Sequence, residues 1–352
     1  ITTLLLSLRP EGQTTGWTLQ NYATLVSEPQ YRQVVLLTFT LAVATTVFSV
    51  LLSVPLSLVL RRKLRGHRFF RTMILVPLVV PGMIAALGLL LIAFVATGCV
   101  DLSVAAILQM SIGIFMLFVK RLGEGALPYG LAASLAFGAV MGVVNGIIVT
   151  RYKVQSFLAT LFTAAILAGV MRLAIGVTPM GVPPAALVGA IKGSLVGEMS
   201  NAVLIFILVA LAALVLLRKT VWGRKVELIG LNPTAAHFAG VDVERTITVT
   251  FGLNGLLAAL AGIMSAGYIG FADQMTLGAG MEMDALVAAV LGGNFLGGGK
   301  ASVLGAVGGA LAITLIVNIV ILFGLDIRFQ YIVKGVLLLS VTYAAVFFNR
   351  RR

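Results

Sequence analysis

The chain has 352 residues, of which 60% are hydrophobic and only 11% are charged. Soluble domains carry about 25% charged residues, so this composition excludes an ordinary soluble protein. The net charge of +13 comes from short basic clusters between apolar blocks. That pattern is typical of cytoplasmic anchors beside membrane spans rather than of nucleic-acid binding. A single cysteine, Cys99, excludes an internal disulfide, and two histidines leave little material for a metal site.

Long uncharged blocks predict membrane-spanning helices, because lipid offers the backbone no hydrogen-bond partners. In chain order these blocks lie at about 34–60, 72–96, 102–119, 128–150, 156–176, 200–217, 247–270, 302–324 and 329–348. A shorter apolar piece, 283–292, is flanked by acids and glycines and is too short to cross alone. The sequence therefore predicts an all-α, polytopic integral membrane protein of about nine to ten transmembrane helices, with one broken or half helix near 283–300.

The basic residues give conflicting orientations. The cluster Arg61–Arg71 is expected in the cytoplasm, and so is the polar stretch 218–246, which carries five Lys and Arg residues. Counting single crossings backward from 218–246 places the segment near Asp101 inside, whereas counting forward from Arg61–Arg71 places it outside. Either one block is re-entrant or the two parts of the chain were not built for each other. We expect one block, 72–96 or 102–119, to be left unspanned.

Two polar motifs interrupt the apolar blocks near Asp101 and Asn145. A carboxylate between apolar blocks is costly unless it faces water or a partner, so Asp101 is a candidate for a solute path. A loop acid at the membrane edge is the alternative. Asn145 lies inside an apolar run, where it either lines a path or makes an interhelical hydrogen bond.

The polar stretch 218–246 predicts a short cytoplasmic helix with a flat face. The signals are a cap, a proline in the first turn and small residues, which fall at Asn232 or Thr234, at Pro233, and at Ala235, Ala236 and Gly240. Such a helix suits docking to a soluble partner. An ordinary basic loop is the alternative.

Glycines dominate the stretch that follows Glu282 and Asp284. The run from Gly292 to Lys300 lacks the spacing of a phosphate-binding loop, in which four residues separate two glycines before Lys-Ser/Thr. No nucleotide site is therefore predicted in this chain. We expect these glycines to permit a broken helix near the middle of the membrane.

Residues from about 98 to 347 resemble the ribose-type branch of the sugar ABC transporter permeases. The motifs occur in the family's order: Val100-Asp101-Leu102-Ser103, Asn145-Gly146, Phe157-Leu158-Ala159-Thr160-Leu161, Thr220 to Arg224, Asn232, Ala235-Ala236, Gly240, Glu282-Met283-Asp284-Ala285, Gly292-Gly293 and Gly297-Gly298-Gly299. The resemblance implies a homodimeric or heterodimeric pore, two cytoplasmic ATPases and a periplasmic solute-binding protein.

The resemblance also implies two groups of functional residues. The ATPase-docking loop is expected at Arg224, Asn232, Ala235, Ala236, Gly240 and Val241. The solute path or its gates are expected at Asp101, Ser103, Asn145, Phe157, Thr160, Glu282 and Asp284. No catalytic residue, metal site or cofactor is expected here, because the partner subunits would bind ATP.

The first part of the chain resembles another class, the binding-protein-dependent permeases for polyamines, ferric iron and similar solutes. Asn21-Tyr22, Pro55 and the Arg61–Arg71 cluster carry this likeness. We therefore expect two parts, an N-terminal membrane segment at 1–97 and a ribose-type transmembrane domain at 98–352, and expect them to be poorly integrated.

The expected function is that of a permease subunit in an ABC importer of a bacterial-type inner membrane. It would move a small polar solute, with a monosaccharide expected, by alternating access driven by partner ATPases. Expected partners are ABC ATPase subunits, a periplasmic solute-binding protein, a second permease subunit and membrane lipid, but no nucleic acid. Alternatives are a permease for a polyamine, an amino acid or another small solute, a membrane enzyme, and an ion-coupled carrier. The last two should gather acids within the spans, whereas the twelve acids here fall mostly at span ends and in loops.

Overall fold

The computed structural model describes residues 97–195, 199–294, 298–299, 302–322 and 329–349. The chain divides into two compact units, Ile1–Ile74 and Leu75–Arg352, and all described residues belong to the second. The spans expected at 34–60 and 72–96, the Arg61–Arg71 cluster and the N-terminal segment 1–97 therefore lie outside the described residues, apart from Thr97.

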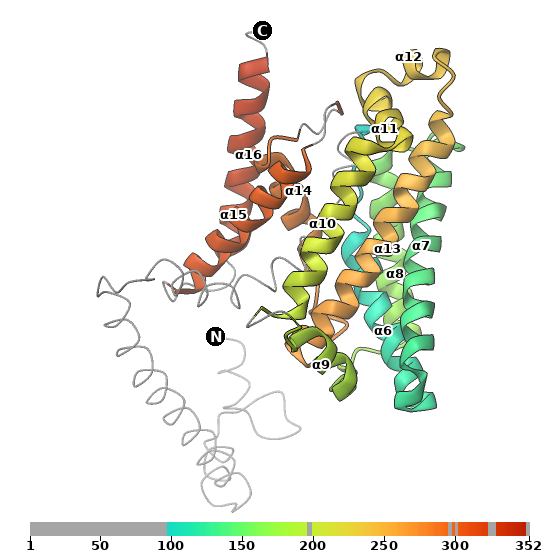
Figure 1. The fold of residues 1–352 in the computed structure, drawn as a ribbon, viewed down its shortest axis with the longest axis vertical. Coiled ribbons are helices and arrows are strands. Elements are labelled where there is room, and N and C mark those ends of the chain that lie inside the picture. The colour runs from blue at the N-terminus through green and yellow to red at the C-terminus, as the bar shows by residue number, and fades with distance from the viewer. Residues whose placement is uncertain (1–96, 196–198, 295–297, 300–301, 323–328, 350–352) are drawn as a thin grey trace, which may run out of the picture. The chain divides into compact units, whose positions relative to one another are not determined.

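The described part of the chain is helical (Figure 1). Its helices are α6 (Val104–Leu122), the 3-10 turn η2 (Glu124–Ala126), α7 (Leu127–Thr150), α8 (Ser156–Ala174), α9 (Ala185–Lys192), α10 (Asn201–Lys219), α11 (Val221–Leu231), α12 (Pro233–Phe238), α13 (Val243–Ile269), α14 (Met281–Leu291), α15 (Val303–Leu322) and α16 (Phe329–Asn349). An isolated bridge between Gly181 and Ala272 is the β pairing found among these residues.

The long helices follow the apolar blocks of the sequence. Within the described residues, α6, η2 with α7, α8, α10 and α13 are each long and apolar enough to cross a membrane. The prediction of an all-α, polytopic membrane protein is confirmed. The prediction of a half helix is also confirmed, because the 11 residues of α14 rise only about 16 Å. The short helix α9 was not predicted.

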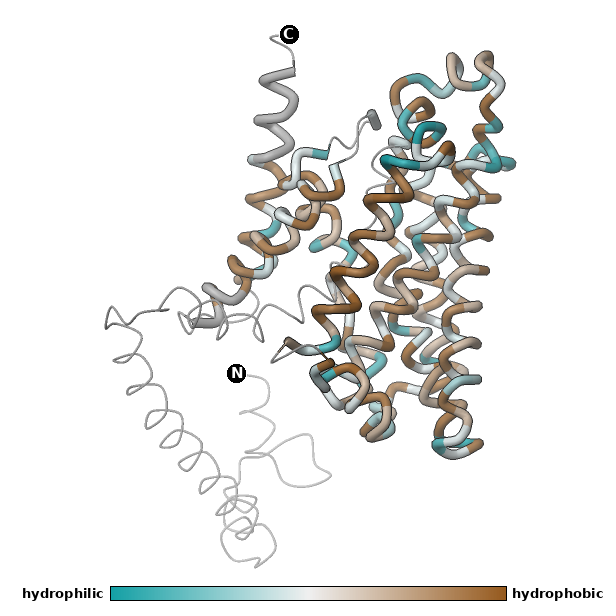
Figure 2. Tube along the Cα trace, viewed as in Figure 1, coloured by the Kyte–Doolittle hydropathy of each residue, from teal (hydrophilic) through white to brown (hydrophobic). Residues whose placement is uncertain are grey.

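Basic residues gather at one end of the bundle. The end of α7, the start of α8, the end of α10 and the start of α13 meet there with α11 and α12, at the top of Figure 1. Figure 2 shows hydrophilic residues collected at this end and apolar ones along α10. Its Lys and Arg residues are Arg151, Lys153, Arg218, Lys219, Arg224, Lys225 and Arg245. The positive-inside rule assigns this end to the cytoplasm.

The segment that precedes α6 starts at this same basic end. The Val100 backbone N–H donates to the Ser156 hydroxyl at the start of α8, at 3.1 Å. Helix α6 therefore runs away from the basic end and finishes at Lys120 and Arg121 on the opposite side. Val100 therefore lies at the basic end, as the count of crossings backward from 218–246 predicts. The count forward from Arg61–Arg71 depends on residues outside the described part of the chain.

Glycines let α7 and α13 pack backbone against backbone. A Cβ added at Gly138, Gly142 or Gly255 would overlap a carbonyl oxygen of the facing helix. In membranes, where lipid is as apolar as a side chain, such close packing is a main source of helix association. Glycines in transmembrane helices are predicted to allow close backbone approach, and this is observed at Gly252, Gly255, Gly262, Gly305 and Gly309. Gly308 differs, because nothing lies within 4 Å of a Cβ added there.

The half helix α14 packs mainly on α15 and α16. Gly292 at its end and Gly305 on α15 lie so close that a Cβ on either would overlap the other's carbonyl oxygen. The preceding loop reaches α6, since the Gln109 side chain donates to the Met275 carbonyl at 3.1 Å. Helix α14 therefore begins alongside the spanning part of α6 rather than at the membrane surface.

Candidate functional site

A buried network of polar side chains joins the segment before α6 to α7, α8 and α13. The Ser103 hydroxyl donates to Asp101 Oδ1 at 2.6 Å, and Asn145 Nδ2 donates to the Ser103 hydroxyl at 2.9 Å. The Thr163 hydroxyl donates to Asn145 Oδ1 at 2.6 Å, and Asn254 Nδ2 donates to Asp101 Oδ2 at 2.7 Å. The network therefore connects four separate parts of the chain through side chains alone.

This network is sealed from solvent. Asp101 is 1% exposed and Asn145 is 0% exposed. Their polar atoms are used on each other, which is what a buried polar group requires to avoid a large desolvation cost. One atom stands apart, because Asn254 Oδ1 has no hydrogen-bond partner among the described residues. In this conformation the side chains of the network are therefore not accessible to a solute.

The two remaining predicted path residues of this region, both on α8, differ in role. Thr160 is fully buried, and its hydroxyl accepts a 3.0 Å hydrogen bond from the Leu102 backbone N–H. It thereby fixes the extended segment before α6. Phe157 is 45% exposed and is not part of the network. The structure thus brings Asp101, Ser103, Asn145 and Thr160 together and leaves Phe157 apart.

The predicted residues Glu282 and Asp284 lie in the first turn of α14. Asp284 forms an ion pair with Lys334 of α16, whose side chain is 7% exposed. The Lys334 ammonium also lies 5.5 Å from the centre of the Tyr331 ring, within cation–π range. A helix N-terminus favours nearby carboxylates, so both acids occupy a suitable place.

Lys334, Thr163 and Asn254 were not predicted as site residues. A signal for Lys334 exists, since a lysine inside the apolar block 329–348 marks a functional or paired position by default. Asn254 inside the block 247–270 gives the same signal in weaker form. Thr163 has no such signal, because a threonine hydroxyl often bonds within its own helix.

Two short helices form a surface at the basic end of the bundle, here called the α11–α12 platform (residues 221–241). The Thr220 hydroxyl caps α11 by accepting from the Gly223 N–H at 3.2 Å. Asn232 Oδ1 caps α12 by accepting from the Ala235 N–H at 3.0 Å, with Pro233 at the first position. The predicted cap and proline are therefore confirmed for Asn232 and Pro233.

The predicted docking residues divide into two sets on this platform. Ala236 and Val241 are buried with Ile229 in a small apolar cluster that attaches α12 to its neighbours. The residues Arg224, Asn232, Ala235 and Gly240 are exposed. Phe238, which was not predicted, is 85% exposed at the end of α12. A contact surface for a partner is available at the exposed set, while Ala236 and Val241 hold the platform in shape.

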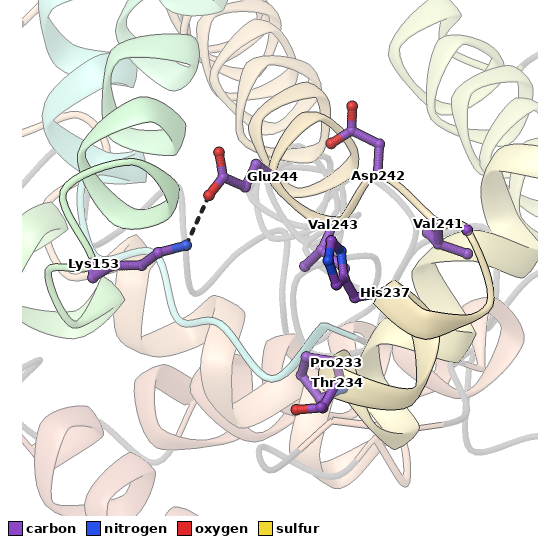
Figure 3. Close-up of a pocket in the computed structure, with 9 residues that line it drawn as sticks. Lys153, Pro233, Thr234, His237, Val241, Asp242, Val243 and Glu244 are labelled. Atoms are coloured by element: carbon purple, nitrogen blue, oxygen red, sulfur yellow. Dashed lines mark hydrogen bonds and ion pairs between the residues drawn. The ribbon is translucent and has the colours of Figure 1, made fainter.

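A groove of about 740 Å³ lies beside α12 (Figure 3). Its lining residues are Lys153, Pro233, Thr234, His237, Gly240, Val241, Asp242, Val243 and Glu244. Lys153 Nζ and a Glu244 carboxylate oxygen form an ion pair at 2.8 Å, seen as the dashed line in Figure 3. Both side chains are mostly exposed, so the pair contributes little stability. Within the described residues, no group of three His, Cys, Asp or Glu side chains is placed to hold a metal ion.

Comparison with known proteins places these features in a family. Residues 72–342 match the model of the family described as "Branched-chain amino acid transport system / permease component". The match begins inside the segment 1–97.

Three curated relatives illustrate the similarity. The ribose import permease protein RbsC of Escherichia coli (strain K12) is 35% identical over 259 residues, which is 73% of this chain and 79% of the relative. The galactofuranose transporter permease protein YtfT of the same strain is 35% identical over 263 residues, 74% of this chain and 75% of the relative. The autoinducer 2 import system permease protein LsrC of Escherichia coli (strain K12 / DH10B) is 37% identical over 243 residues, 69% of this chain and 70% of the relative. No solved structure matches the chain.

Proposed function

Because the chain belongs to the family of the branched-chain amino acid transport system permease component, we propose that it imports a small polyhydroxylated solute, a monosaccharide or a compound of similar size. It is a multi-pass ABC permease of the inner membrane and not an enzyme. The observation that carries the proposal is its 35% identity to two permeases whose names specify ribose and galactofuranose.

The runner-up solute class is an amino acid or a polyamine. The family description itself names branched-chain amino acids, which favours the amino acid of these two. A charged solute would need compensating charges along its path. The buried pair of Asp284 with Lys334 neutralises itself, whereas Asp101 and Glu282 form no ion pair among the described residues. Charge alone therefore does not separate the solute classes, and the similarity to permeases named for ribose and galactofuranose favours a neutral solute rich in hydroxyls.

The α11–α12 platform is the proposed docking surface for an ABC ATPase. It lies at the basic end of the bundle and presents Arg224, Ala235, Phe238 and Gly240 to solvent. An exposed phenylalanine flanked by small residues supplies an apolar anchor of the kind that dominates protein interfaces. A periplasmic solute-binding protein would meet the opposite end, and a second permease subunit would complete the pore.

The buried network is proposed to be part of the gate rather than a standing solute site. Asp101, Ser103, Asn145 and Thr160 bond to each other and close the bundle. Opening a path between α6, α7 and α8 would expose these groups to water and to solute hydroxyls. Glu282 and Asp284 would lie beside the path at the start of the half helix, and Phe157 outside it.

Photo-crosslinking tests the docking surface. A photoreactive amino acid would replace Phe238 on the platform and, as the matched control, Tyr129 on α7, which is exposed at the opposite end. Both variants would be expressed with the partner ABC ATPase. We expect a crosslinked ATPase from position 238 and none from position 129. Equal crosslinking at both positions, or none at 238 from a transport-competent complex, contradicts the docking proposal.

Stimulated ATP hydrolysis tests the solute class. The purified complex of the chain with its partner ATPase and solute-binding protein would be assayed with D-ribose, D-galactose, leucine and putrescine. We expect an aldose to raise the rate of ATP hydrolysis and the two nitrogenous solutes to leave it unchanged. Stimulation by leucine or putrescine alone would replace the sugar proposal with the runner-up.

A further inference from the structure

A buried glutamine joins two loops at the outer end of the bundle, opposite the basic end. Gln274 lies in the loop between α13 and α14 and is 0% exposed. Its Nε2 donates to the Thr178 carbonyl at 2.8 Å and to the Gly176 carbonyl at 3.3 Å, both in the loop between α8 and α9. Its Oε1 accepts from the Met180 N–H at 3.2 Å. One side chain, here called the Gln274 clasp, thus spends all of its hydrogen-bonding groups on the backbone of another loop.

Backbone bonds beside the clasp join the same two loops. The Met180 N–H also donates to the Ala272 carbonyl at 2.8 Å, and the Ala272 N–H donates to the Gly181 carbonyl at 2.7 Å. On the other side of the clasp, the Met275 carbonyl accepts from the Gln109 side chain of α6 at 3.1 Å. Hydrogen bonds therefore connect the α8–α9 loop, the α13–α14 loop and α6 at one place.

Both loops lie beside α6 and not beyond its end. Ile175, at the start of the α8–α9 loop, fills the space that a Cβ on Gly113 of α6 would need. Helix α6 continues from Gly113 to Leu122, which is about 14 Å of helix. Non-helical backbone at membrane depth is tolerated only where it is buried in protein or lines a water-filled cavity. The exposed side chains in these loops include the polar Thr178 and Thr276, which indicates that the loops line water on their outer side.

The clasp is continuous with the start of the half helix. Residues 271–291 are described without a gap, and Gln274 precedes Glu282 in the first turn of α14 by eight residues. The loop begins at Gly270 with φ +81 and ends at Gly280 with φ +79. Glycine adopts this left-handed backbone without a steric cost, and hinge positions are loop residues that absorb such changes of φ and ψ. The loop therefore has a hinge position at each end.

We propose that the Gln274 clasp is an outer gate of the permease, separate from the buried network near the basic end. With the clasp formed, the two loops meet across the outer side of the path. With the clasp broken, they part and a solute reaches the start of α14. Water can replace hydrogen bonds to loop backbone, so opening breaks no helix packing. Gln274 is thus a positioning residue for solute entry, and this inference rests on the proposed function.

Asn201 offers a matched control for Gln274. It is 8% exposed and lies at the same end of the bundle, at the start of α10. Its Nδ2 donates to the Ala190 carbonyl at 2.9 Å, and its Oδ1 accepts from the Leu195 N–H at 2.9 Å. Asn201 is therefore also a buried amide that bonds to backbone, but its bonds do not join the two loops of the clasp. The variants Gln274→Met and Asn201→Leu each replace the amide by an apolar group of similar size.

A cysteine behind the clasp reports its opening. Ala272 is 0% exposed, and Ala272→Cys would be introduced in a Cys99→Ser background. The full chain would be reconstituted in proteoliposomes and treated with an impermeant maleimide from the non-cytoplasmic side. Loss of the three bonds of Gln274 should raise the rate of modification by at least about tenfold. Asn201→Leu should leave the rate within about threefold of the parent chain, although it too lowers the melting temperature.

A second measurement leaves Gln274 intact and separates a gate from a static brace. The Ala272→Cys chain is assembled with the partner ATPase and solute-binding protein, and modification is compared with and without ATP. We expect faster modification during ATP hydrolysis, because the outer gate then opens repeatedly. This measurement decides the matter even where Gln274→Met does not fold.

Two results overturn the proposal of an outer gate. One is an equal rate of modification in Gln274→Met and Asn201→Leu. The other is a rate in the intact chain that ATP does not change while solute uptake proceeds. A chain that imports no sugar and stimulates no ATP hydrolysis would instead refute the proposed function, so the two failures are distinguishable.

Discussion

Two substitutions of Asp101 should differ in how much they destabilise the buried network. In the variant Asp101→Ala, three donors lose their acceptor in a site that excludes water: the Ser103 backbone N–H, the Ser103 hydroxyl and Asn254 Nδ2. Each unpaired buried donor costs about 1–3 kcal/mol, whereas interhelical hydrogen bonds in membranes average about 0.6 kcal/mol. We take about 2 kcal/mol for the three donors together, which multiplies the fraction of open molecules by about thirty.

The variant Asp101→Asn should cost much less. Its amide oxygen can keep the bonds from Ser103, and its new NH₂ group faces Asn254. The Asn254 amide can turn over and present Oδ1, which has no partner among the described residues, as an acceptor. One interhelical bond is exchanged for another of similar strength, so we expect a loss below about 1 kcal/mol.

The native cysteine provides the assay. Cys99 is the only cysteine of the chain, lies two residues from Asp101 and is buried. A maleimide dye should modify it only when the segment opens, at a rate proportional to the open fraction. We expect modification about thirty times faster in Asp101→Ala, and within about threefold of wild type in Asp101→Asn. Equal rates for the two variants would refute the account of the network.

Three further predictions concern packing, the buried ion pair and topology. Gly142→Leu should force α7 away from α13 and destabilise the bundle by about 1–3 kcal/mol, measured as a lower melting temperature in detergent. The control Gly169→Leu on α8, where nothing lies within 4 Å of an added Cβ, should leave the melting temperature unchanged. Lys334→Met should cost about 3–5 kcal/mol by leaving Asp284 unpaired, and the double variant with Asp284→Leu should recover most of it; a double variant as unstable as the single one argues against the pair. In a Cys99→Ser background, His67→Cys and Lys153→Cys should react with an impermeant thiol reagent only from the cytoplasmic side and Leu122→Cys only from the other. Reaction of His67→Cys from outside would show that the block 72–96 crosses once and that the Arg61–Arg71 cluster is not cytoplasmic.

The spanning helices could be predicted from the sequence, because the thickness of the bilayer fixes their length and its apolar interior fixes their composition. The blocks at 102–119, 128–150 and 247–270 became α6, α7 and α13 with ends shifted by a few residues. Local chemistry likewise identified the Asn232 cap, since the capping oxygen and the Ala235 N–H that donates to it are three residues apart. Helix α9 was missed because eight residues without a cap signal are too short for a periodic pattern.

The arrangement of side chains could not be predicted in the same way. Asp101, Asn145 and Asn254 are far apart in sequence, and their meeting depends on how α6, α7 and α13 rotate about their axes. Small residues at 235 and 236 indicated a flat helix face but not which side it would take. The structure buries Ala236 against Ile229 and exposes Ala235, a difference set by tertiary packing.

ATP-driven uptake into proteoliposomes tests the central claim most directly. The chain would be reconstituted with its partner ATPase. ATP would be enclosed on the platform side, and labelled D-ribose or D-galactose would be supplied outside together with the solute-binding protein. The account predicts accumulation of an aldose that requires ATP and the binding protein, and that is lost when Phe238→Asp blocks the platform. Accumulation without ATP, or a fully active Phe238→Asp variant, would contradict it.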